Sequence, residues 1–143
     1  MADPSLLECF ENPCPQREYV IEHHADPFAS VCPKTGHPDF GSVLLRYVPH
    51  QLCVELKSLK LYLQAYRNEG IFYEAVTNRI AEDLYRVTES RWLMIETRWA
   101  GRGGIQSTIR VEMGHMPEQV TEEFDDDAPL ERPSDDDRVP PGY

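Results

Sequence analysis

The chain has 143 residues, 41% of them hydrophobic and 27% charged, which is typical of one globular domain, and no run approaches the roughly 18 apolar residues of a membrane span. Residues 1–5 have neither the positive charge nor the apolar segment of a secretory signal, so a cytoplasmic protein without a membrane anchor is predicted. The net charge of −11 lies mostly in residues 117–143, which carry −8, and the lack of a basic stripe argues against direct binding of nucleic acid.

The first half of the chain predicts two strands around a polar loop. Residues 17–24 are expected to form a short strand, and residues 42–48, which are apolar on both sides, a buried one. The loop between them, over residues 25–41, is rich in Pro, Gly and Asp and contains Cys32. A further extended piece is expected at residues 52–55.

Two helices are expected next. The first is indicated by four side chains spaced i, i+3, i+4 and i+7 on one face: Leu59, Tyr62, Leu63 and Tyr66. Gly70 is expected to end this helix. An apolar stripe indicates a second, longer helix: Phe72, Val76, Ile80, Leu84 and Val87.

The last strands complete a predicted α+β fold. Residues 91–99 and 105–111 are expected to be strands, joined through Arg102 and two glycines. The order strand, strand, helix, helix, strand, strand indicates an antiparallel four-stranded sheet with two helices on one face. Its two open edges favour pairing with other subunits. We divide the chain into a folded domain, residues 1–116, and an acidic, proline-rich tail, residues 117–143, which is expected to be disordered.

The loop around Cys32 is the first candidate for chemistry. A cysteine in a polar loop, with Lys34 and His37 nearby, can have a lowered pKa and act as a nucleophile. Asp39, seven residues further on, can serve as an acid if the loop folds back. On residue types alone, an inert cysteine in a surface turn is the commoner case.

A second candidate site is cationic. Lys57 and Lys60 are three residues apart, so on a helix they share one face, where two ammonium groups suit a cofactor phosphate. Arg102 can join them, because the adjacent glycines let a backbone approach a phosphate closely. Solvated surface charges are the ordinary alternative.

Glu74, near the start of the second helix, has two interpretations of equal weight. It is either a first-turn acid favoured by the helix dipole, or a carboxylate that accepts paired N–H donors from a guanine-like edge. In the second case Phe72 or Tyr73 would pack nearby.

The cysteines and histidines indicate no metal site. The four cysteines include no C-x-x-C pair, and their spacing to the histidines matches no structural zinc pattern. Reduced thiols and no bound metal are therefore expected.

These segments together resemble the QueF family, the nitrile reductases of queuosine biosynthesis. The cysteine loop is similar to that family's active-site loop, and residues 55–62 match its signature, Glu-Ser/Leu-Lys-Ser/Ala-hydrophobic-Lys-Leu-aromatic, at every position. The resemblance extends from about residue 7 to residue 113. It implies the tunnelling fold (T-fold), shared with GTP cyclohydrolase I. For short members it implies a ring-shaped homo-oligomer, typically a decamer of two stacked pentamers with active sites between subunits.

The resemblance also implies an activity. An NADPH-dependent oxidoreductase of this family reduces the nitrile of 7-cyano-7-deazaguanine (preQ0) to the amine of 7-aminomethyl-7-deazaguanine (preQ1), a step toward a modified tRNA nucleoside. Cys32 would add to the nitrile carbon to form a thioimide, and Asp39 would protonate the nitrogen. The positions that match the family's other substrate contacts are Val54, Glu55, Leu56, Tyr73 and Glu74. Those that match its NADPH contacts are Lys57, Lys60 and Arg102.

Two departures and three alternatives qualify this interpretation. Leu56 takes the leucine option of the signature, so a serine hydroxyl is absent at that position. Where the family often has histidine, this chain has Tyr73, whose phenol donates a hydrogen bond but does not titrate near neutrality. An amidinotransferase acting on the nitrile of preQ0 in tRNA shares the cysteine and aspartate but lacks the lysine-bearing signature. A zinc-dependent cyclohydrolase-like enzyme would need ligand spacing that this chain lacks. A non-catalytic purine-binding protein would require Cys32 to be inert.

Overall fold

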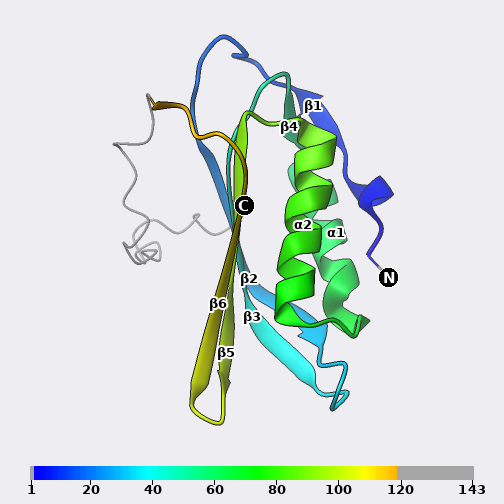
Figure 1. Cartoon of the computed structure of the whole chain (residues 1–143). Coiled ribbons are helices and arrows are strands. Elements are labelled where there is room, and N and C mark those ends of the chain that lie inside the picture. Colours follow the sequence, from blue (N-terminus) through cyan, green and yellow to red (C-terminus); the bar gives the residue numbers. More distant parts are fainter. Residues whose placement is uncertain (1, 119–143) are drawn as a thin grey trace, which may run out of the picture.

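A computed structural model describes residues 2–118 of the protein (Figure 1). The helices and strands are, in chain order, η1 (Pro4–Leu6), β1 (Cys9–Glu11), β2 (Ile21–Val31), β3 (Pro38–Val48), β4 (Leu52–Val54), α1 (Leu56–Gln64), η2 (Ala65–Asn68), α2 (Tyr73–Thr88), β5 (Trp92–Arg102) and β6 (Ile105–Gly114). In this part of the chain no helix is long and apolar enough to cross a membrane.

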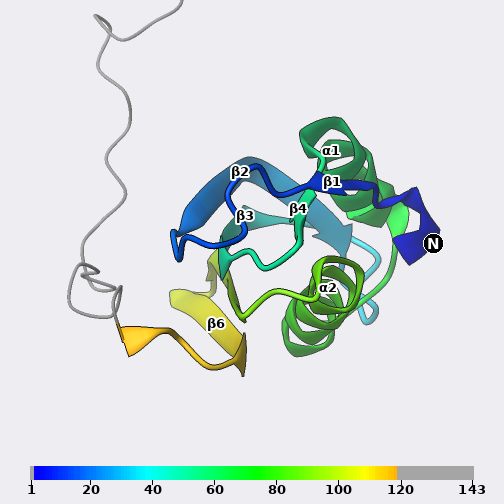
Figure 2. The ribbon, with the colours of Figure 1, turned by 90° about the horizontal axis from the view of Figure 1, so that it is seen from above.

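The main sheet has four antiparallel strands in the order β2-β3-β5-β6. Helices α1 and α2 cover one of its faces, as Figure 2 shows from above. This confirms the predicted α+β architecture, and β2 and β6 are the edges of that sheet. The short strands β1 and β4 pair separately beside the helices.

The core lies between the helices and the covered face of the sheet. Strand alternation brings Val43, Leu45 and Tyr47 of β3 to that face, where they join Ile80 and Leu84 of α2 in one buried cluster. Full burial of each such aliphatic side chain contributes roughly 1.5–3 kcal/mol relative to exposure. Of the apolar stripe seen in the sequence, Val76, Ile80 and Leu84 therefore hold α2 on the sheet. Phe72, expected in the same stripe, instead precedes the helix and is 57% exposed.

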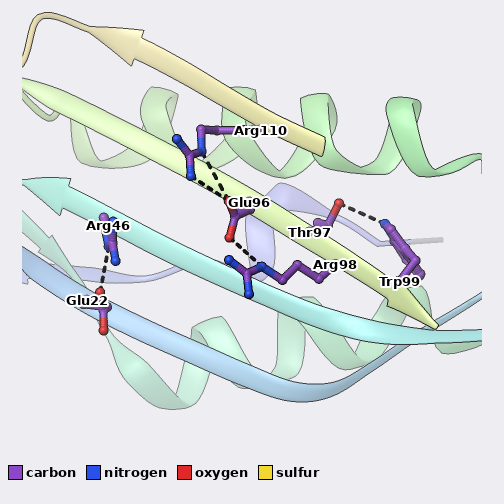
Figure 3. A network of polar contacts seen from close by, with 7 residues as sticks. All are labelled: Glu22, Arg46, Glu96, Thr97, Arg98, Trp99 and Arg110. Carbon is purple, nitrogen blue, oxygen red and sulfur yellow. Dashed lines mark hydrogen bonds and ion pairs between the residues drawn. The ribbon is translucent and has the colours of Figure 1, made fainter. Parts of the chain in front are cut away.

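The opposite face of the sheet carries charged pairs (Figure 3). The Glu96 carboxylate accepts from Arg98 at 3.0 Å and from Arg110 at 2.9 Å, and Arg46 pairs with Glu22 at 2.7 Å. Glu96 is almost fully buried, so loss of its partners would leave a costly unpaired charge. These residues alternate along the strands with the core residues of the other face.

The structure corrects several predicted boundaries. The loop expected over residues 25–41 is only residues 32–37, because β2 extends to Val31 and β3 begins at Pro38. Pro27, which suggested a loop, lies where the β2–β3 register shifts between Ala25 and Phe28. An edge strand tolerates proline at such a bulge, since the missing N–H has no ladder partner to lose.

The other differences are smaller. Strand β1 was not predicted from the sequence. The first helix ends at Gln64 and continues as the 3-10 turn η2, before Gly70. Of the predicted tail, only Pro117 and Glu118 fall within the described residues; the prediction for the rest lies outside them.

Candidate active site

Three segments that are distant in sequence meet at one end of the sheet. The backbone of Val31 accepts from Ile71 N at 3.0 Å and donates to Glu69 O at 2.9 Å. These bonds hold the end of β2 beside the start of α2, so the loop over residues 32–37 lies next to the first turn of that helix. The end of β5 approaches the same place through Arg102.

Cys32 is the first residue of this loop, and its surroundings favour the thiolate form of its side chain. Its N–H donates to His37 O and its carbonyl accepts from Gly36 N, both at 2.9 Å. Hydrogen bonds from the Thr35 hydroxyl, from Arg102 and from the backbone N–H groups of Thr35 and Lys34 lower the pKa of the Cys32 thiol to about 6. At pH 7 most of this thiol is therefore ionised.

The groups that activate Cys32 differ from those expected. The sequence indicated the side chains of Lys34 and His37, whereas the largest effect on the pKa of Cys32 comes from Thr35. The Thr35 oxygen accepts from His37 N at 3.2 Å, which leaves its own hydrogen for the sulfur. His37 thus contributes through its backbone.

Asp39 shares a partner, Arg102, with Cys32. It is 5% exposed, and its Oδ1 accepts from the Tyr73 hydroxyl at 3.2 Å and from Arg102 Nη2. Because Arg102 also donates to Cys32, one guanidinium contacts both the nucleophile and the candidate acid. The thiolate is the main cause of the raised pKa of Arg102, with Asp39 adding to it.

Tyr73, the first residue of α2, lies flat against Trp99 of β5. The ring centroids are 4.1 Å apart and the planes are 8° from parallel. Burial, followed by the charge of Asp39, raises the pKa of Tyr73, so its phenol stays neutral. Trp99 had no role in the sequence interpretation.

Arg102 is fixed at the end of β5 by a two-residue turn. Its backbone pairs with Ile105, and the turn between them is Gly103-Gly104, with φ of 55° and 83°. Both positions need positive φ for a tight hairpin turn that follows the strand twist, which glycine adopts without strain.

The predicted substrate residues divide between the two ends of α2. Tyr73 and Glu74 lie at its start, beside Cys32, and Glu74 is exposed. Val54 instead pairs with Cys9, whose thiol donates to Val87 O near the end of α2. At 1.5 Å per residue this is roughly 20 Å from Tyr73. One chain therefore does not bring all these residues together.

Glu55 has a structural role in the isolated chain. It is the N-cap of α1, and its two carboxylate oxygens accept from Lys57 N at 2.8 Å and Ser58 N at 2.7 Å. These bonds, first that from Ser58, lower the pKa of Glu55. The next residue, Leu56, is 60% exposed and free to meet a ligand or another subunit.

Lys57 and Lys60 do share a face of α1, and both line a cavity of about 660 Å³ between α1 and β2. Its walls are mostly apolar, and Arg67 adds a third cation. A dinucleotide needs cations for its phosphates and apolar surface for its rings, so this donor set fits NADPH. Arg102 is not among the residues that line this cavity.

The described residues contain no group of three or more His, Cys, Asp or Glu side chains placed to hold a metal ion. All four cysteines are free thiols. At the Cys32 end, a thiol of lowered pKa lies near a carboxyl, a phenol and a guanidinium.

Comparison with known proteins identifies the family. The model of the QueF-like protein family matches residues 38–118. The NADPH-dependent 7-cyano-7-deazaguanine reductase of Rhodopirellula baltica is 58% identical over 73% of this chain and 87% of its own length. That of Chlorobaculum tepidum is 48% identical over 79% of this chain and 97% of its own. The chain belongs to the QueF-like family.

A solved structure extends the comparison to the fold. The archaeosine synthase QueF-Like in its apo form superposes with a TM-score of 0.64, covering 68% of this chain and 96% of that one. At 18% identity this likeness concerns the fold alone, and it confirms the T-fold expected for a QueF-like chain. The individual site residues and the ring-shaped assembly remain predictions.

Proposed function

We propose that this chain reduces the nitrile of preQ0 to the primary amine of preQ1 with NADPH, as an enzyme of queuosine biosynthesis. The reductases named above, 48–58% identical to it, support this activity. The observation that carries the proposal is that Arg102 donates to both Cys32 and Asp39 at one end of the sheet. The substrate is the free base rather than a tRNA, in keeping with a folded part that has no basic stripe.

Cys32 begins the reaction as a nucleophile. Its thiolate sulfur forms a bond to the nitrile carbon, and one C–N π bond becomes a lone pair on nitrogen. Asp39 takes up the proton that leaves the Cys32 thiol and passes it to that nitrogen, and the product is a thioimide. Arg102 and Thr35 favour this step because their hydrogen bonds keep the thiol ionised near neutral pH.

The second stage needs a hydride donor. When bound, NADPH would supply two hydrides in succession, which with one further proton from solvent would take the thioimide carbon to the oxidation level of an amine. Cys32 is a good leaving group in this stage, since a thiol of low pKa departs readily as the thiolate. Lys57 and Lys60 would hold the cofactor phosphates at the cavity beside α1, with Arg102 as the third predicted cofactor contact.

The active site is built between subunits. Residues predicted to bind one substrate lie at opposite ends of α2, so Val54, Glu55 and Leu56 of one copy would complete the site around Cys32 of another. Edge strands β2 and β6 allow the four-stranded sheets to continue from copy to copy. A ring-shaped decamer of two stacked pentamers accommodates both features. The enzyme acts in the cytoplasm, where its free cysteines stay reduced.

Intact-mass measurement with preQ0 and no NADPH tests the first stage. Wild type should gain the mass of preQ0, and Cys32→Ala should not. Addition of NADPH should then discharge the adduct and oxidise two NADPH per preQ1. An adduct on Cys32→Ala would refute the assignment of Cys32 as the nucleophile. An adduct that does not react with NADPH but releases an amidine with ammonia would identify an amidinotransferase instead.

A further inference from the structure

We propose that a stacked ring pair and a buried chain of hydroxyls position the acid of the reaction. In this arrangement Trp99, Thr97 and Thr77 hold Tyr73, and Tyr73 holds the carboxyl of Asp39. The inference deepens the proposed function, because it takes Asp39 as the group that protonates the nitrile nitrogen.

The contact between Tyr73 and Asp39 suits a group that must change its protonation state. The phenol lies 3.2 Å from Oδ1 and donates to the carboxylate. A hydroxyl both donates and accepts, so it can keep this bond when Asp39 carries a proton, whereas the guanidinium of Arg102 has donors only. The raised pKa of Tyr73 keeps the phenol hydrogen in place. Tyr73 is therefore the partner that stays with Asp39 throughout the proton transfer.

The plane of the Tyr73 ring is set by Trp99. The two rings stack at 4.1 Å, and Trp99 also packs edge-on against Phe28 at 5.7 Å. Gly41 lies directly across the strand pair from Trp99. A Cβ at Gly41 would come within 2.3 Å of Arg98 O and 3.0 Å of the indole, so only glycine leaves room for this packing.

The position of Tyr73 is set a second time through its backbone. Trp99 Nε1–H donates to Thr97 Oγ1 at 2.9 Å, a bond visible in Figure 3, and Thr77 Oγ1 donates to Tyr73 O at 2.7 Å. The two threonine oxygens are 2.6 Å apart. Because each hydroxyl has one hydrogen and that of Thr77 is used on Tyr73, Thr97 must donate to Thr77.

The chain of bonds therefore runs in one direction, from indole to Thr97 to Thr77 to the carbonyl of Tyr73. It closes on itself, since the indole that starts the chain is stacked on the Tyr73 ring where the chain ends. Thr77 and Thr97 are 0% exposed and Trp99 is 4% exposed, so water cannot replace a missing member. An acid needs its donor group held within about 0.5 Å of the productive position, and this closed chain of hydrogen bonds provides such a constraint.

Removal of one hydroxyl tests the inference. Thr77→Val keeps the shape of the side chain and interrupts the closed chain of hydrogen bonds. We expect thioimide formation to slow about 5- to 10-fold, with the Michaelis constant for preQ0 within about 2-fold of the wild-type value. Thr77→Ser, which restores a hydroxyl, should recover most of the rate. Trp99→Phe removes the indole donor and keeps the ring stack, so it interrupts the same chain of hydrogen bonds at a second point.

Thr88 offers a matched control in the same helix. Its hydroxyl donates to Leu84 O at 2.8 Å and contacts the Ser90 hydroxyl, the same pattern as in Thr77, but at the other end of α2. Thr88→Val should lower the melting temperature about as much as Thr77→Val and leave the rate of thioimide formation unchanged. A rate loss in Thr77→Val that matched Thr88→Val would overturn the inference.

A double variant shows whether the hydroxyl chain acts through the phenol. Tyr73→Phe keeps the stack, loses the bond to Asp39 and should slow thioimide formation about 10-fold. Adding Thr77→Val should then cost little more, because the group being positioned is gone. Fully additive losses would refute the inference. If wild type forms no adduct, the proposed function fails instead.

Discussion

The two ends of α2 differ in what their polar groups do. At the Tyr73 end, Arg102 donates to both Cys32 and Asp39, the candidate reacting groups. At the Val87 end, both carboxylate oxygens of Glu55 accept hydrogen bonds from backbone N–H groups. One chain thus brings the predicted reacting groups together but only part of the predicted binding surface, and we propose that the rest, which includes the exposed Leu56, serves the site of another copy.

Mixing two inactive variants should give the largest effect, and it tests whether the active site is divided between two copies of the chain. Cys32→Ala removes the nucleophile, and Leu56→Asp places a charge in the predicted substrate surface at an exposed first helical position, where the helix dipole favours an acid. Each alone should show background NADPH oxidation. Assemblies formed from both should recover roughly a quarter of the wild-type rate, the share of sites with two intact halves.

Separate assembly of the same two variants is the control. If the mixture does no better than the sum of its parts, the active site lies within one chain, and the proposed interface is wrong.

The three predicted cofactor contacts should separate into two classes. Lys57→Ala and Lys60→Ala should each raise the Michaelis constant for NADPH about 10- to 100-fold, from the roughly 1.5–3 kcal/mol of a charged hydrogen bond, and leave thioimide formation intact. Arg102→Ala should slow thioimide formation as well, because Arg102 contacts both Cys32 and Asp39. Normal NADPH use by both lysine variants would show that Lys57 and Lys60 are solvated surface charges.

The pH dependence of Cys32 alkylation sharpens the account of the reactive end. With the thiol pKa lowered to about 6, the rate with iodoacetamide should rise with pH to a midpoint near 6. Thr35→Val and Arg102→Gln each remove a donor to the thiolate, which raises the pKa and moves the midpoint to higher pH. Thr35→Ser is the matched control. A wild-type midpoint near 9 would contradict the activation proposed for Cys32.

Truncation after Met116 should have the smallest effect. Met116 packs against the buried cluster on the outer face of the sheet, so this cut keeps that contact. The removed residues are too acidic and proline-rich to bury a core, and turnover should stay within about 2-fold of wild type. A changed oligomer size on gel filtration would show that the tail takes part in assembly.

Periodicity was enough to predict the fold but not the details of the site. The stripe through Val76, Ile80 and Leu84 predicts α2 because burial follows the 3.6-residue repeat. The proximity of Cys32 and Asp39 could also be predicted from the sequence, because the seven positions that separate them span a single loop. Strand β2 was truncated in the prediction because Pro27 normally ends a strand, and only its edge position explains why it does not.

The missed contacts join residues that are far apart in sequence. Arg102 and Asp39 are 63 positions apart, and Thr77 and Thr97 are 20 apart. No spacing rule links such residues; they meet only because β3, β5 and α2 pack together. Trp99 and Thr35 were missed for a related reason, since an aromatic core residue and a loop hydroxyl are common in any sequence.

The bulge at Pro27 has a consequence for how copies of the chain associate. An unbroken edge strand is a template for open-ended addition of further strands, the geometry of fibrils. In β2 the register shift and the missing N–H interrupt the edge partway along its 11 residues. A strand that docked there would meet two short stretches of edge instead of one long stretch, which disfavours fibrillar growth.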